Sequence, residues 1–92
     1  MAESTHCIVN IASPLRSYTG GAAKVNARGA TVAEVLADLE QRSKGMRFRI
    51  IDEQDRIRPH ICLFVGTRRV HSLAEPVVAN DELHVICALS GG

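Results

Sequence analysis

The sequence has no tryptophan and only three aromatic residues among its 92 positions. Aromatic side chains often dominate a small hydrophobic core, so valine, isoleucine, leucine and alanine must fill this one. Apolar residues make up 46% of the chain, which is enough for a single core. This length lies near the lower end of independent folding, and we expect one domain over residues 1–92.

Membrane and secretion signals are also lacking. No run approaches the roughly 20 apolar residues of a membrane helix, and residues 1–6 do not resemble a secretory signal. The three cysteines, Cys7, Cys62 and Cys87, show no CxxC spacing. They indicate reduced thiols rather than a zinc site or a disulfide framework. We therefore expect a cytoplasmic protein with no membrane partner.

Charge of one sign does not dominate, since the net charge is +1. A nucleic-acid partner would call for a concentrated basic patch, so none is expected. Arginines nevertheless cluster in two places, at Arg47, Arg49, Arg56 and Arg58, and at Arg68 and Arg69. Solvated loops are the simpler interpretation of these clusters, and a surface for an acidic partner is the alternative.

Motifs of an enzyme active site are missing. The chain has no Walker A sequence and no catalytic triad signal, and Thr19-Gly20-Gly21 is too short for a phosphate loop and indicates a hairpin turn. The four histidines are scattered. A metal site formed by His60 and His84 on neighbouring strands is disfavoured, so we predict no metal and no bound cofactor.

Runs of β-branched and apolar residues predict five strands. Four of them span His6–Ala12, Lys24–Ala27, Ile61–Val65 and Glu82–Ala88, and a short one lies around Arg69-Val70. The segment Met46–Pro59 is polar and shows no clear period. Within it, Phe48, Ile50 and Ile51 are expected to pack over one end of the core.

Residues 31–43 carry the clearest helix signal. Thr31 and Glu34 form a capping box, and Gly45 is expected to stop the helix in a left-handed conformation. Apolar residues follow at helical spacing on one face: Val32, Val35, Leu36 and Leu39. With the strands, this helix suggests an α+β protein of β-grasp fold, in which the hairpin and helix let the first and last strands pair in parallel at the sheet centre.

The chain ends in Ser90-Gly91-Gly92, directly after the last predicted strand. Glycines have no side chains and adopt backbone angles closed to other residues. Such a tail can thread a narrow channel and place its terminal carboxylate beside a reactive phosphate. We therefore expect residues 89–92 to form a flexible functional tail, with the α-carboxylate of Gly92 as the working group.

This β-grasp order with terminal Gly91-Gly92 resembles ubiquitin and the prokaryotic sulfur carriers (ThiS/MoaD-like). The run Leu83-His84-Val85-Ile86 stands at the same distance from the glycines as a similar run in ubiquitin. Carriers of cysteine synthesis are the better match. Residues 11–21 are similar to the N-terminal hairpin of these carriers, and Thr31-Val32 with Asp38-Leu39-Glu40 is similar to their helix. Ile61–Val65 resembles their third strand, and the charged segment 47–59 is in keeping with them. Cys87-Ala88 departs from them, since many carriers have a proline there.

The resemblance implies a protein substrate rather than an enzyme. An E1-like adenylyltransferase would use ATP-Mg to adenylate Gly92, and sulfur would then replace AMP to give a thiocarboxylate. The implied receiver is a pyridoxal-phosphate-dependent synthase that makes cysteine or a related sulfur compound. A metalloprotease that processes or releases the carrier is a further implied partner.

Alternation along the last long strands predicts a partner surface. Inward-facing residues would be Ile61, Leu63, Val65, Leu83, Val85 and Cys87. Cys62, Phe64, His84 and Ile86 would then face outward and lead to Leu89 and the tail. An exposed apolar patch of this kind often marks a partner site. The alternative is that the segment 47–59 covers it.

Three other functions remain open. A ubiquitin-like modifier would join Gly92 to lysines through isopeptide bonds, so it differs from a carrier in the acyl acceptor. The small subunit of a molybdopterin synthase would insert its tail into a large partner's active site. A plain β-grasp interaction module would tolerate the loss of Gly92.

Overall fold

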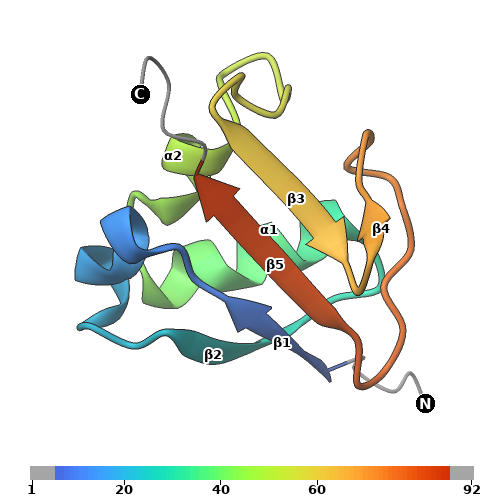
Figure 1. The fold of residues 1–92 in the computed structure, drawn as a ribbon, viewed down its shortest axis with the longest axis horizontal. Helices are drawn as coiled ribbons and strands as arrows, with labels where there is room; N and C mark the ends of the chain where they lie inside the picture. The colour runs from blue at the N-terminus through green and yellow to red at the C-terminus, as the bar shows by residue number, and fades with distance from the viewer. Residues whose placement is uncertain (1–5, 88–92) are drawn as a thin grey trace.

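The computed structural model describes residues 6–87, and Figure 1 shows a mixed sheet with the main helix packed behind it. The elements are β1 (His6–Asn10), η1 (Ser13–Thr19), β2 (Lys24–Arg28), α1 (Val32–Arg42), α2 (Met46–Ile50), β3 (Ile61–Val65), β4 (Arg68–Arg69) and β5 (Glu82–Cys87). In this part of the chain, no helix combines the length and the apolar character needed to cross a membrane.

The sheet has five strands in the order β2-β1-β5-β3-β4. β1 and β5 are parallel, with Val9 opposite Leu83, and the other neighbouring strands are antiparallel. The first and last strands therefore pair as predicted, and the β-grasp fold of the α+β class is confirmed.

α1 begins at the predicted N-cap Thr31, and Glu34 reaches back to Ala30, one residue before that N-cap. The Thr31 hydroxyl accepts a hydrogen bond from the Glu34 N–H (3.2 Å), and the Glu34 carboxylate accepts one from the Ala30 N–H (2.9 Å). The predicted apolar stripe is at most 1% exposed at each position: Val32, Val35, Leu36 and Leu39. Gly29 permits a close approach here, because a Cβ on it would lie 2.6 Å from the Val35 nitrogen.

The first strand is shorter than predicted. β1 ends at Asn10, and the 3₁₀ helix η1 follows. Pro14 lies in the first turn of η1, where its missing N–H removes no helical hydrogen bond, and Leu15 anchors the turn in the core. The turn predicted from Thr19-Gly20-Gly21 follows directly, with Gly20 at φ +66°.

Sequence analysis missed α2 and misplaced two residues, Gly45 and Phe48. Gly45 has φ +92°, but it precedes α2 rather than ending α1. Met46 and Ile50 are one helical turn apart and fully buried. Phe48 lies on the opposite side of the same turn and is 58% exposed, so the prediction that it packs over the core is wrong. The predicted burial of Ile50 and Ile51 is confirmed.

Candidate functional site

The outer face of the sheet, away from α1, brings the predicted patch residues together. β3 and β5 are antiparallel, with Cys62 opposite Ile86 and Phe64 opposite His84. The residues between them along β3 and β5 are buried, and Cys87 at the end of β5 is partly buried and packs against the core. The predicted strand faces are therefore confirmed, and Cys62, Phe64, His84 and Ile86 are called the outer patch below.

The outer patch is open to a partner. Ile86 is 45% exposed, and the other three residues are half-buried. The alternative that the segment 47–59 covers the patch is wrong. Ile50 and Ile51 of this segment enter the core. In Figure 1 the loop between α2 and β3 lies beyond the N-terminal end of β3 rather than across the sheet.

Two further residues extend the outer patch sideways across the sheet. Asn10 of β1 is paired with His84, and Arg69 of β4 is paired with Phe64. The Asn10 amide donates to the Glu82 carboxylate at 2.9 Å, and this bond is the main reason that the pKa of Glu82 lies below its usual value. Sequence reasoning named neither residue as part of the site. Alternation in β1 could have indicated Asn10, whereas Arg69 requires the strand register.

A second feature lies at the end of β5, where the described chain stops. A pocket of about 420 Å³ there is lined by Pro14, Leu15, Ser17, Tyr18, Arg49, His60 and Cys87. The Tyr18 hydroxyl accepts a hydrogen bond from Arg49 Nε at 2.6 Å. Burial raises the pKa of the Cys87 thiol, so this cysteine is protonated and a poor nucleophile at neutral pH. The predicted tail, Leu89 to Gly92, lies outside the described residues.

The structure places all three cysteines, and it shows how the possible metal-binding side chains are distributed within residues 6–87. Cys7 is buried, Cys62 and Cys87 are partly buried, and all three are free. Among residues 6–87, no group of three or more histidine, cysteine, aspartate or glutamate residues is placed to hold a metal ion.

Solved structures of ubiquitin-like proteins share this fold. A chain in the crystal structure of the Amycolatopsis orientalis BexX/CysO complex has a TM-score of 0.87 and 34% identity, over 94% of this chain and 99% of that one. The crystal structure of Mycobacterium tuberculosis CysO has a TM-score of 0.86 and 27% identity, and the match covers 90% of this chain and 99% of that one. Small archaeal modifier protein 1 of Haloferax volcanii (TM-score 0.79, 22% identity, over 95% and 99%) shows the shared fold alone. The protein is thus a ubiquitin-like β-grasp protein.

Sequence similarity identifies the family. The sulfur carrier protein CysO of Mycobacterium tuberculosis is 30% identical over 89 residues, which cover 91% of this chain and 96% of that protein. The Mycobacterium bovis sulfur carrier protein CysO matches with the same values. No model of a known protein family matches the chain. The chain belongs to the CysO family of ubiquitin-like sulfur carriers.

Proposed function

We propose that this protein carries sulfur as a thiocarboxylate on Gly92 for the synthesis of cysteine or a related sulfur compound. The observation that carries the proposal is the match to the sulfur carrier CysO over 96% of that protein. The sequence is in keeping with it, since the two glycines Gly91-Gly92 stand a few residues after β5, as the proposed chemistry requires.

The proposed chemistry begins with activation of the Gly92 carboxylate. A carboxylate is a poor acyl donor, because its leaving group would be oxide. Attack by a carboxylate oxygen on the α-phosphate of ATP-Mg forms an acyl-adenylate and releases pyrophosphate. A sulfide, or a persulfide on a partner, then attacks the acyl carbon and releases AMP. When a persulfide is the donor, the product is an acyl disulfide; a second thiol of the partner attacks the partner's sulfur in it, forms a disulfide there and releases the thiocarboxylate.

In this scheme the protein is a co-substrate of partner enzymes. An E1-like adenylyltransferase activates Gly92, and a pyridoxal-phosphate-dependent synthase receives the sulfur. A metalloprotease partner and a cytoplasmic location remain predictions from the resemblance. The CysO in the Amycolatopsis orientalis structure is in a complex with BexX, which supports the view that such carriers dock on partner proteins. The outer patch is the surface that we propose for docking on the adenylyltransferase.

Activation can be tested by pyrophosphate release. We predict that the protein ending at Gly92 supports ATP-dependent pyrophosphate release by its cognate adenylyltransferase. Deleting Gly92, or adding an alanine after it, moves the carboxylate away from the α-phosphate. Displacements of about 1 Å can cost on the order of a hundredfold in rate, so both variants should be inactive. Equal release from either variant would exclude Gly92 as the activated residue.

A further inference from the structure

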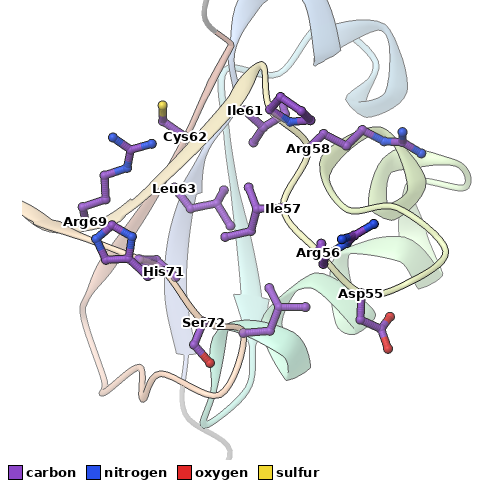
Figure 2. Close-up of a pocket in the computed structure, with 13 residues that line it drawn as sticks. Asp55, Arg56, Ile57, Arg58, Ile61, Cys62, Leu63, Arg69, His71 and Ser72 are labelled. Atoms are coloured by element: carbon purple, nitrogen blue, oxygen red, sulfur yellow. The ribbon is translucent and has the colours of Figure 1, made fainter.

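A groove runs along the β4 edge of the sheet, between the loop before β3 and the chain after β4. Figure 2 shows this pocket of about 480 Å³. Five apolar side chains line it, and they are buried or packed against the core: Ile57, Ile61, Leu63, Val70 and Leu73. Arg56 and Arg58 come from the loop, and Arg69 and His71 come from β4 and the residues after it. We call this pocket the arginine groove.

Two guanidinium groups of the arginine groove have no carboxylate partner within residues 6–87. Arg58 donates through Nε to the Phe48 carbonyl at 2.7 Å and lies 4.4 Å from the centre of the Phe48 ring, so it is held in place without being neutralised. The Arg69 side chain is exposed, and neither a hydrogen bond nor an ion pair to another described residue engages it. By contrast, Arg68 pairs with Glu75 at 3.4 Å.

The acidic groups near the groove are already engaged. Asp55 is the one carboxylate that lines it, and Asp55 pairs with Arg47 at 3.1 Å. Glu75 accepts the His71 N–H at 2.8 Å in addition to its pairing with Arg68. Residues 47–72 contain six arginines and three carboxylates, although the whole chain has a net charge of only +1. The two sides of the groove therefore carry positive charge, and apolar side chains line the space between them.

The arginine groove is continuous with the outer patch. Cys62 belongs to both. Arg69 is paired with Phe64 across β3 and β4, so its side chain leaves the sheet on the same face as Phe64. In Figure 2, Cys62 and Arg69 lie along one side of the pocket, and Arg56 and Arg58 lie on the other. A protein seated on the outer patch thus reaches the groove by continuing over the β4 edge.

We propose that the arginine groove binds an acidic segment of the adenylyltransferase that docks on the outer patch. Carboxylates of that segment pair with Arg58 and Arg69, and an apolar side chain between them packs on Ile57 and Leu73. This proposal rests on the proposed function for the identity of the partner. Charge complementarity at such a site steers association and selects the partner.

Charge reversal at Arg69 tests the proposal. Binding of the labelled protein to the E1-like enzyme encoded in the same genome is measured by fluorescence anisotropy without ATP, over a salt series. We predict that Arg69→Glu raises the Kd at least about tenfold, because it replaces an attraction across the interface by a juxtaposition of like charges, which is costly. Arg58→Gln should also raise the Kd. Wild-type affinity should fall with salt because screening weakens exposed charge pairs, and the variants should show a smaller salt dependence.

Arg28→Glu is the matched control, because Arg28 is an exposed arginine on β2 at the opposite edge of the sheet. It changes the net charge equally and should leave the Kd within about twofold, a difference that corresponds to less than half a kcal/mol. Circular dichroism confirms that each variant is folded. Equal effects of Arg69→Glu and Arg28→Glu, or no effect of either, would overturn the groove proposal. Failure of pyrophosphate release by the wild type would instead count against the proposed function, because binding is measured separately.

Discussion

Glu40 shows how a single residue connects the two helices. Its carboxylate accepts hydrogen bonds from the N–H groups of Gly45 and Arg47, each at 2.9 Å. These bonds, aided by the charges of Lys44 and Arg47, hold the pKa of Glu40 below its usual value. The start of α2 therefore has a carboxylate partner for N–H groups that a helix cannot satisfy internally.

We predict that Glu40→Gln lowers the melting temperature at neutral pH and that the difference from wild type narrows on acidification. A carboxyl group with a lower pKa in the folded state stabilises the fold above its unfolded value, about 4.3. That contribution is lost as the pH falls through the folded value. Thermal unfolding from about pH 7 to about pH 3 measures it, with the exposed Glu53→Gln as control. If the difference in melting temperature between Glu40→Gln and wild type stayed constant over this pH range, the carboxylate of Glu40 would not be the stabilising group.

At the scale of elements, the sequence predicted the elements that are long enough to show a periodic pattern, and it missed a helix that is too short to show one. Alternation assigned the faces of β3 and β5, and helical spacing located α1. α2 has five residues, too few for a visible period, and its inward positions Met46 and Ile50 are separated by charged residues and Phe48. Phe48 was misplaced because hydrophobicity alone suggested burial, whereas the turn of α2 directs it outward, where Arg58 stacks on it.

The strand faces lead to a prediction about the outer patch. Phe64→Asp and Ile86→Asp should leave the circular dichroism spectrum intact, because both side chains reach solvent, yet abolish pyrophosphate release through loss of docking. Leu63→Asp, one position along β3 and fully buried, should unfold the protein, since an unpaired buried charge is costly. A Phe64 or Ile86 variant that folds and is activated at the wild-type rate would remove the outer patch from the docking surface.

In the whole molecule, the features proposed for partner recognition lie on one continuous surface. The outer patch occupies β3 and β5, the arginine groove follows the β4 edge, and the described chain ends at Cys87 of β5 beside a second pocket. The sequence showed two clusters of arginines, but it did not show that members of both clusters line the same groove. Arg58 and Arg69 line one groove because β4 pairs with β3 and because the loop before β3 packs Ile57 against the core.

The central claim is that Gly92 carries sulfur, and mass spectrometry of the protein tests it most directly. After incubation with the cognate adenylyltransferase, ATP-Mg and sulfide, we predict a C-terminal peptide in which one oxygen of Gly92 is replaced by sulfur. Omitting ATP is the control and should leave the carboxylate unchanged. Persistent isopeptide conjugates between Gly92 and lysines, with no thiocarboxylate detectable, would contradict the carrier account and favour a protein modifier.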